Sequence, residues 1–273
     1  MQYETKLKRY KKYLSANELS EGTQKLYITQ ARKFLEYVGD RELDKEMLVE
    51  YKEILLGRGK AASTYNTYIA AINGYLRFEK RKDLKIKMLR IQKKRNLKHM
   101  LRMSDYYRLL EHAKQSGRVK YYYIMKTLAL TGARISELKY FTVEALDTKE
   151  IVVANKGKIR EVCLPERLIW ELKKYCRISL IKEGSIFRGK QGKPITRNAV
   201  YQMMQILAKE ADINQKCVHP HNFRHLFAVT YMKYYSNIFE LADLLGHANL
   251  ETTRIYAVTS IEEKRRKLDK LGL

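Results

Sequence analysis

A strongly basic segment divides this chain into two parts. The run from Lys80 to Lys98 reads KRKDLKIKMLRIQKKRNLK and holds ten basic residues against the single acid Asp83. Such a change of composition is typical of a connector between domains, and 273 residues suffice for two domains. We therefore expect one domain over residues 1–80, a basic linker over 81–99 and a second domain over 100–273. Charge runs of this kind are usually solvated, although this one could also lie along a polyanion.

Helical patterns fill the sequence before the linker. Apolar residues such as Phe34 and Val38 recur three and four positions apart, which is the period of a helix with one buried face. Ser20, Asp44 and Ser63 each precede such a pattern and suit the N-cap position. We expect a bundle of about four helices over the first domain.

Beyond the linker the pattern changes character once. Helical periodicity runs through most of the second domain, including the stretch ARISELKYF. Residues 147–165 instead contain EIVVANKGKIREVCLP, in which two stretches rich in β-branched residues flank a KGK turn. This pattern predicts a β-hairpin. The expected fold is therefore mainly α, with a helical N-terminal bundle and a mostly α second domain that contains a small β-sheet.

The net charge narrows the class of partner. Lys and Arg number 55 against 30 Asp and Glu, which gives a formal charge of +25 at pH 7 and a pI of about 9.8. Nucleic acid is the first candidate, because each neutralised phosphate releases counterions. The rival is an anionic membrane surface, but no apolar run approaches the roughly 18 residues of a spanning helix. The N-terminal MQYETKLKRYKKYL lacks the apolar core of a signal peptide, so we expect a cytoplasmic protein.

Cysteine usage indicates neither a disulfide framework nor a cysteine-built zinc site. Cys163, Cys176 and Cys217 are odd in number and form no C-x-x-C pair, which favours reduced packing residues. We expect no cofactor and no metal.

The densest group of chemically useful residues is HPHNFRHLFA, from His219 to Ala228. On a helix that begins near His221, residues three and four apart share a face, so His221, Arg224 and His225 can point at one small volume. Arginine is planar and always charged, and imidazole can transfer protons. The substrate group that suits such a cluster best is a phosphate.

A zinc site is the competing interpretation of the same histidines. His221 and His225 have the i, i+4 spacing of the motif H-E-x-x-H, and His219 and His247 could add ligands. Asn222, however, replaces the glutamate that this motif needs, and an arginine places a cation inside the cluster. These two departures disfavour a metalloenzyme.

Two further elements suit phosphate chemistry. TGARISEL places Arg134 at a helix start after Gly132, where backbone N–H groups favour an anion. Together with Arg224 it would supply two guanidinium groups, which stabilise the added charge of a pentacoordinate phosphorus transition state. Lys156, in the hairpin turn, offers an ammonium group that could reach a leaving oxygen.

A nucleophile is available in LLGHANLETTRIYA, where Tyr256 lies nine residues after His247. A phenol that attacks a phosphodiester leaves an aryl phosphate on the enzyme. Because the ordinary pKa of tyrosine is about 10, nearby arginines and an imidazole are needed to favour phenolate in the transition state. The chain has 21 tyrosines, so it is the place of Tyr256 in this ordered set that singles it out.

Taken in order, these residues resemble the tyrosine recombinase, or phage integrase, family. The resemblance is dense over the second domain, and the helical first domain is similar to that family's core-binding domain in pattern and position. Asn222 and Phe223 stand where an acid and a leucine are frequent in the family. The matching elements are Arg134 in TGARISEL, Lys156 in the hairpin, His221-x-x-Arg224, His247 in LLGH, and Tyr256.

The resemblance implies a site-specific recombinase that cleaves and rejoins DNA without ATP or metal. Arg134 and Arg224 would grip the scissile phosphate, and Tyr256 would attack it to form a 3′-phosphotyrosyl link. Lys156 would act as general acid toward the leaving 5′ oxygen, with Lys158 of the same turn as the less favoured candidate.

The remaining polar residues of the cluster would assist this reaction. The resemblance implies that His221 and His247 contact the phosphate and transfer protons. Glu137, three residues after Arg134, matches an acidic position in the family and would orient that arginine. We expect a supporting role for His225.

The tail after Tyr256 predicts an assembly. Ser260 and Glu263 form a capping-box pattern that opens a helix with a narrow apolar stripe. That stripe would pack on its own domain or, as the resemblance implies, on a neighbouring protomer. We expect a homo-oligomer on double-stranded DNA, with a tetrameric synapse formed through the tail. Two alternatives stay open, a type IB-like topoisomerase and a non-catalytic basic DNA-binding regulator.

Overall fold

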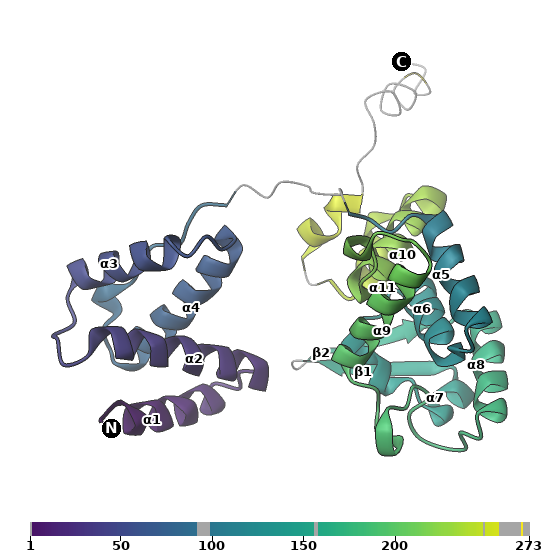
Figure 1. Ribbon diagram of the computed structural model, residues 1–273, viewed down its shortest axis with the longest axis horizontal. Helices are drawn as coiled ribbons and strands as arrows, with labels where there is room; N and C mark the ends of the chain where they lie inside the picture. The colour runs from purple at the N-terminus through teal and green to yellow at the C-terminus, as the bar shows by residue number, and fades with distance from the viewer. Residues whose placement is uncertain (1, 92–98, 156–157, 248, 257–268, 270–273) are drawn as a thin grey trace. The chain divides into compact units, whose positions relative to one another are not determined.

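The computed structural model describes residues 2–91, 99–155, 158–247, 249–256 and 269. The chain divides into two compact units, Met1–Lys94 and Arg95–Leu273 (Figure 1). The division falls inside the basic segment that the composition picks out. No helix among the described residues is long and apolar enough to cross a membrane.

The N-terminal unit is a helical bundle, as its periodicity predicts. Helix α2 packs against both α1 and α4. Aromatic side chains fill much of the core: Tyr10 and Tyr75 meet edge to face with ring centroids 5.2 Å apart, and Phe34 and Tyr51 do the same at 5.1 Å. The described elements are α1 (Gln2–Ala16), α2 (Glu21–Val38), α3 (Lys45–Leu56), α4 (Ala62–Phe78) and the 3-10 helix η1 (Lys82–Leu84).

Two of the three predicted N-caps are confirmed. The Ser20 side chain accepts a hydrogen bond from a backbone N–H in the first turn of α2. Asp44 accepts one at 2.8 Å at the start of α3. Each cap satisfies a donor that the helix itself leaves without a partner.

The third predicted cap, Ser63, is wrong. Helix α4 begins at Ala62, so Ser63 lies inside the first turn. The hydroxyl of Tyr65 explains this start, because it accepts a hydrogen bond from the backbone N–H of Lys60 and donates one to the carbonyl of Leu56. These contacts tie the end of α3 and the loop after it to the first turn of α4.

Two asparagines of α4 hold the chain that leaves this unit. The Asn73 amide donates to the carbonyl of Ile86 at 2.9 Å and accepts from its N–H at 2.8 Å. Asn66 makes the same pair of bonds with Leu89, at 2.9 and 2.8 Å. Each side chain thereby supplies the hydrogen bonds that a neighbouring strand would otherwise supply. The basic segment as far as Leu89 is therefore fixed against α4.

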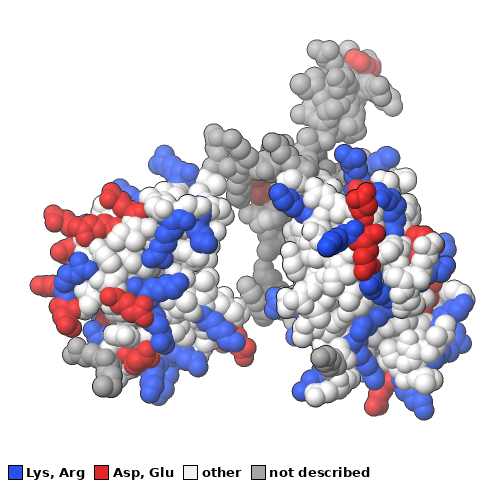
Figure 2. Space-filling model, in the orientation of Figure 1, with Lys and Arg blue, Asp and Glu red and all other residues white. Residues whose placement is uncertain are grey.

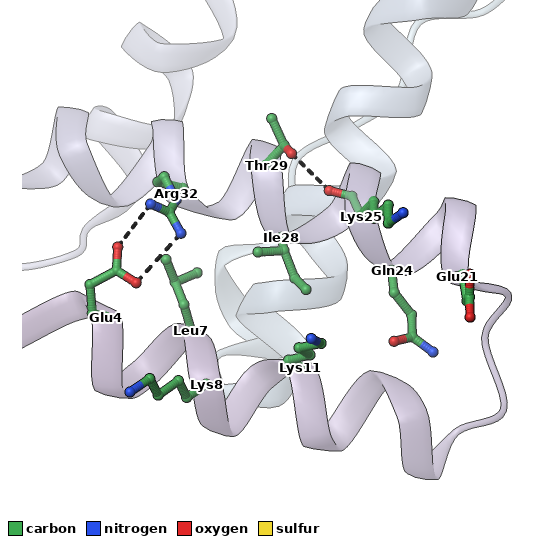
Figure 3. Close-up of a pocket in the computed structure, with 10 residues that line it drawn as sticks. All are labelled: Glu4, Leu7, Lys8, Lys11, Glu21, Gln24, Lys25, Ile28, Thr29 and Arg32. Carbon is green, nitrogen blue, oxygen red and sulfur yellow. Dashed lines mark hydrogen bonds and ion pairs between the residues drawn. The ribbon is translucent and has the colours of Figure 1, made fainter.

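A groove of about 740 Å³ lies between α1 and α2 (Figure 3). Leu7 and Ile28 lie between the two helices, and Arg32 pairs with Glu4 across them at 2.9 Å. A half-exposed ion pair of this kind adds only about 0–1 kcal/mol, so apolar contact holds α1 in place. The other lining residues are Lys8, Lys11, Glu21, Gln24, Lys25 and Thr29.

The C-terminal unit is mostly α with one small sheet (Figure 1). Helix α6 lies at its centre, with Ile124, Met125 and Leu128 fully buried, and both α5 and α10 pack against it. The helices are α5 (Met103–Gln115), α6 (Val119–Thr131), α7 (Val143–Thr148), α8 (Glu166–Ile178), α9 (Arg197–Glu210), α10 (Pro220–Tyr235) and α11 (Ile238–Leu245). The 3-10 helices are η2 (Ile135–Tyr140), η3 (Lys190–Gly192), η4 (Gln215–Cys217), η5 (Leu250–Thr252) and η6 (Arg254–Tyr256).

The predicted hairpin is confirmed. Strands β1 (Glu150–Asn155) and β2 (Lys158–Cys163) pair antiparallel, with Val153 opposite Arg160. Burial alternates along the strands, since Val153 and Val162 are buried whereas Ile159 is 75 % exposed. Because side chains two apart share a face of a strand, Arg160 lies on the buried face with Val162.

Candidate active site

Helix α10 carries the first part of the predicted cluster. His219 is its N-cap residue and Pro220 opens the first turn, where the missing N–H of proline removes no helical hydrogen bond. The helix therefore starts where the spacing predicts. The rings of His221 and His225 meet edge to face with centroids 4.3 Å apart. Arg224 points into the protein and is only 1 % exposed.

Arg224 is held by the ends of two helices. It donates from Nη1 to the carbonyl of Gly132 at 2.7 Å and from Nη2 to the carbonyl of Leu245 at 2.6 Å. These carbonyls end α6 and α11, where the helix dipole places partial negative charge. Gly132 and Gly246 cap the two helices in the left-handed conformation, with φ of 61° and 60°. Main-chain dipoles thus orient a buried cation.

Arg134 lies just after α6, in the segment expected to be helical. The structure forms the 3-10 helix η2 there, because the left-handed Gly132 ends α6 and Arg134 itself is extended. Glu137 accepts from the Arg134 backbone N–H at 2.7 Å and from its Nη1 at 2.9 Å. The expected contact between Glu137 and Arg134 is therefore present, and it caps η2 as well.

Arg160 is a residue of this site that the sequence interpretation missed. Its Nη2 donates to Glu137 at 2.6 Å and its Nη1 to the carbonyl of Leu244 at 2.7 Å. Its Nε is buried and has no hydrogen-bond partner in the part of the chain that the structure describes. The sequence did hold a signal for this residue. Arg160 lies two positions before Val162 in the predicted strand, so the two side chains share a face, and a charged residue on a buried face is unusual.

His247 joins Arg224 through a hydrogen bond. Its Nε2 lies 2.9 Å from Nη2 of Arg224, and its Nδ1 lies 2.8 Å from Oγ1 of Thr253. Arginine can only donate, so Nε2 is the acceptor and Nδ1 carries the proton that it donates to Thr253. Thr253 is fully buried and was also missed, because a threonine in a loop has no distinctive spacing.

Tyr256 packs beside these groups at the end of η6. It is 9 % exposed and shares a small core with Ala228, Leu241 and Leu245. A hydrogen bond joins its hydroxyl to Nδ1 of His225. Residues from α10 and from the chain after α11 thus bring the predicted nucleophile to the predicted cluster.

Burial and positive charge shift the pKa values of these groups. Burial raises the pKa of Tyr256 to about 12, and Arg224 opposes this rise. Burial, followed by the nearby Arg224, lowers the pKa of His247 to about 4. Burial, followed by Arg134 and Arg160, lowers the pKa of Arg224 to about 9, so it is still a cation at neutral pH.

Glu137 is the exception to this pattern. Burial is the largest influence and raises the pKa of its carboxyl, but the hydrogen bonds from Arg134 and Arg160 together outweigh it and hold the pKa below its usual value. The carboxylate is therefore ionised and lies among arginines.

The lysine expected as general acid falls outside the described residues. The sequence places Lys156 between β1 and β2, and Lys158 is described only as the first residue of β2. The hairpin nevertheless lies close to the arginines, because Arg160 of β2 contacts both Glu137 and Leu244.

Two of the four histidines that suggested zinc, His225 and His247, form hydrogen bonds to other groups of the site. Nδ1 of His225 bonds to Tyr256, and both ring nitrogens of His247 bond to Arg224 and Thr253. Across the described part of the chain, no group of three or more His, Cys, Asp or Glu is arranged to hold a metal ion.

Two family models match the chain. One described as the phage integrase family covers residues 99–263, and one described as the phage integrase N-terminal SAM-like domain covers residues 7–83. The chain belongs to the phage integrase family. The resemblance carried by Arg134, Arg224 and Tyr256 is thereby confirmed.

Relatives of this phage integrase family member extend over nearly its whole length. A tyrosine recombinase of Thermosipho africanus is 29 % identical to this chain, and the match covers 92 % of this chain and 94 % of that protein. Tyrosine recombinase XerA of Thermococcus kodakarensis is 26 % identical over 275 residues, covering 98 % and 95 %. The predicted enzyme class, a tyrosine-type site-specific recombinase, is confirmed, and the topoisomerase and non-catalytic alternatives are not favoured.

Solved structures confirm the fold class. The crystal structure of XerA recombinase has a TM-score of 0.53 at 25 % identity and covers 97 % of this chain and 96 % of that one. The Tn1549 transposon integrase in complex with circular intermediate DNA has a TM-score of 0.75 at 17 % identity, covering 97 % and 99 %. At that identity the second likeness concerns the fold alone.

Proposed function

We propose that this member of the phage integrase family cleaves and rejoins double-stranded DNA through a 3′-phosphotyrosyl link to Tyr256. The observation that carries the proposal is a surplus of positive charge beside the tyrosine. Arg134 and Arg160 both pair with the carboxylate of Glu137, whereas Arg224 has no carboxylate partner among the described residues. Two positive charges are left over, which suits a phosphodiester as it gains charge in the transition state.

Arg134 and Arg224 are assigned to the scissile phosphate. The fork of Arg224 is fixed by two main-chain carbonyls before any substrate arrives, so little reorganisation is needed at the moment of reaction. The side chain of Arg134 is 36 % exposed and is braced by Glu137, which leaves part of its fork open to a ligand. Two such forks can hold a phosphate by several charge-assisted hydrogen bonds.

Tyr256 is the proposed nucleophile. Its oxygen would attack the phosphorus, the bond to the 5′ oxygen would break, and the 3′ phosphate would stay on the enzyme until another strand end attacks it. Lys156 is proposed as the general acid for the 5′ oxygen, with Lys158 as the alternative. His221 and His247 are assigned to phosphate contact and proton transfer. Their positions support this assignment, because His221 lies against His225 and His247 is hydrogen-bonded to Arg224.

Double-stranded DNA is the proposed partner of both units. Lys and Arg side chains are spread over the visible face of each unit (Figure 2), within a chain of net charge +25. Among the similar folds, XerH was solved bound to its difH substrate, with a TM-score of 0.71 at 22 % identity. We assign residues 1–80 to DNA binding, 81–99 to the linker and 100–273 to catalysis, and we place the protein in the cytoplasm with its DNA.

Assembly into a tetrameric synapse is a further part of the proposal. The tail that would mediate it, with Ser260 and Glu263, lies outside the described residues. Strand exchange between two duplexes requires four cleavages, and each protomer supplies one Tyr256. A homo-oligomer on DNA follows from that stoichiometry.

Covalent trapping tests the reaction and identifies the target site in one experiment. Tagged protein is incubated with fragments of the DNA that surrounds its own gene, denatured, and recovered together with any DNA attached to it. Sequencing of the attached ends identifies the site, and a nicked substrate built from that site then accumulates the adduct for measurement.

The control variants are Tyr256→Phe and Tyr235→Phe. Tyr235 is 68 % exposed at the end of α10, so its hydroxyl should be dispensable. We expect adduct from wild type and from Tyr235→Phe, and none from Tyr256→Phe, which should still bind the site. Equal adduct from Tyr256→Phe would refute the assignment of the nucleophile.

A further inference from the structure

The hydroxyl of Tyr256 has one hydrogen-bond partner among the described residues, Nδ1 of His225. The two ring centroids are 5.4 Å apart with 55° between the planes. His225 is fixed on α10 and Tyr256 on η6, and the small core under Tyr256 includes Ala228, one turn after His225. The contact is therefore built by the packing of two elements.

The other polar groups of the site form no hydrogen bond with this hydroxyl among the described residues, and His221 instead meets the ring of His225, with centroids 4.3 Å apart. Both nitrogens of His247 are already engaged, by Arg224 and by Thr253. Arginine and lysine carry no acceptor. Both oxygens of Glu137 accept hydrogen bonds from arginines. Nδ1 of His225 is therefore the nitrogen that the described site places against the hydroxyl.

We propose that His225 is a catalytic residue whose Nδ1 takes the phenol proton of Tyr256 during DNA cleavage and returns it during rejoining. This inference rests on the proposed function of Tyr256. As the bond from Tyr256 to phosphorus forms, its O–H bond breaks and the proton moves to Nδ1. The bond from phosphorus to the 5′ oxygen breaks, and that oxygen takes a proton from the general acid. In rejoining, each bond change and each proton transfer is reversed.

The electrostatics of the pocket support this assignment. Burial is the largest influence that lowers the pKa of His225, to about 4, so its ring is neutral and ready to accept at neutral pH. With the pKa of Tyr256 near 12, spontaneous phenolate is scarce and the reaction needs a base. A phosphate held by the arginines would add negative charge, which favours the imidazolium that forms. The charged and titratable groups that face His225 are His219, His221, Arg224, His247 and Tyr256.

His225→Asn is the variant that separates proton transfer from positioning. The oxygen of an asparagine can accept the hydrogen bond from Tyr256, as Nδ1 does, but it cannot take up the proton. General acid–base catalysis contributes about 10²–10⁴-fold, so we expect adduct formation on the nicked substrate to slow by at least about 10²-fold. Site binding and thermal unfolding should be close to wild type. The control His112→Asn, on α5, should cleave at the wild-type rate.

A more acidic nucleophile then tests the chemical role. Both wild type and His225→Asn are prepared with a fluorinated tyrosine at position 256, whose phenol loses its proton more readily. If His225 accepts that proton, the fluorinated residue narrows the difference in rate between the two proteins. Cleavage by His225→Asn at the wild-type rate overturns the proposal, and so does a slow rate that the fluorinated residue leaves unchanged. Loss of adduct in Tyr256→Phe remains the separate test of the underlying function.

The tautomer of His225 gives a second readout that does not depend on DNA. Nitrogen NMR of ring-labelled protein distinguishes a bare Nδ1 from one that carries hydrogen. We expect a bare Nδ1 and a protonated Nε2 in wild type near neutral pH. A hydrogen on Nδ1 would make His225 a donor to Tyr256 and would overturn the assignment.

Discussion

Arg160 and Glu137 form an ion pair with an N–O distance of 2.6 Å, in which the carboxylate side chain is 1 % exposed. The pair joins the β-hairpin to the segment that carries Arg134, because the same carboxylate binds both arginines. Arg160 also reaches the carbonyl of Leu244, close to the end of α11. Three parts of the active site therefore depend on one buried negative charge.

Substitution of that carboxylate should destabilise the C-terminal unit. Glu137→Gln keeps the shape but leaves Arg134 and Arg160 beside a neutral amide, which also presents N–H groups toward them. Loss of one partner from a buried pair costs about 3–5 kcal/mol, and we expect the free energy of unfolding in urea to fall by that order. The control is Glu161→Gln on the exposed side of β2. If Glu137→Gln lowers the free energy of unfolding no more than Glu161→Gln does, the buried ion pair contributes little to stability.

Thr253 should act on the reaction through His247. Thr253→Val keeps the volume but removes the acceptor for the Nδ1 proton, so the ring loses the bond that fixes its tautomer toward Arg224. We expect adduct formation to slow by about tenfold, equivalent to about 1.4 kcal/mol in the barrier, with site binding retained. Thr252→Val is the matched control. Thr252 is exposed, and its hydroxyl donates to the carbonyl of Asn249 and forms no hydrogen bond with His247 among the described residues. An unchanged rate in Thr253→Val would remove Thr253 from the site.

The sequence predicted the parts of this site that local spacing determines. His221, Arg224 and His225 are brought together by the period of one helix, and the hairpin follows from β-branched residues around a turn. Arg224 and Tyr256 lie on separate elements, and composition alone does not bring them together. Their place in the ordered pattern of the family does, and the family match confirms that pattern.

Long-range contacts account for what the sequence left out. Arg160 belongs to the site because a sheet face meets the end of α11, and Thr253 belongs because a loop folds back onto His247. Neither contact has a fixed separation in sequence. Ser63 was expected as a cap on propensity, but a tertiary contact of Tyr65 sets the start of the helix instead.

The stability of the protein should fall on mild acidification. The folded pKa values of His225 and His247 are about 4, below the ordinary value of 6.5. Between these values the unfolded chain binds more protons than the folded one, so stability is full above pH 6.5 and is lost as the pH falls toward 4. Urea unfolding measured across this range should show a shallower pH dependence for His247→Asn than for wild type. The same slope in both proteins would contradict the burial of a neutral His247.

Gly132 should be required for two reasons: its backbone is in the left-handed conformation, and its surroundings leave no room for a side chain. Its φ is 61°, and an added Cβ would lie 2.6 Å from Phe227 and 2.8 Å from Leu245. Gly117 has a similar φ of 70° but nothing within 4 Å of an added Cβ, so Gly117→Ala introduces the backbone strain alone. Gly132→Ala adds overpacking to that strain, and we expect it to cost about 1–3 kcal/mol more than Gly117→Ala in urea unfolding.

The same pair of variants should separate stability from activity. Leu245 and Gly132 provide the two carbonyls that hold Arg224, so a side chain forced between them displaces the guanidinium from its fixed position. Adduct formation per folded molecule should therefore fall in Gly132→Ala and stay at the wild-type level in Gly117→Ala. If both variants cleave equally well, Arg224 does not depend on the ends of α6 and α11 for its orientation, and its action on the phosphate must be set by the DNA itself.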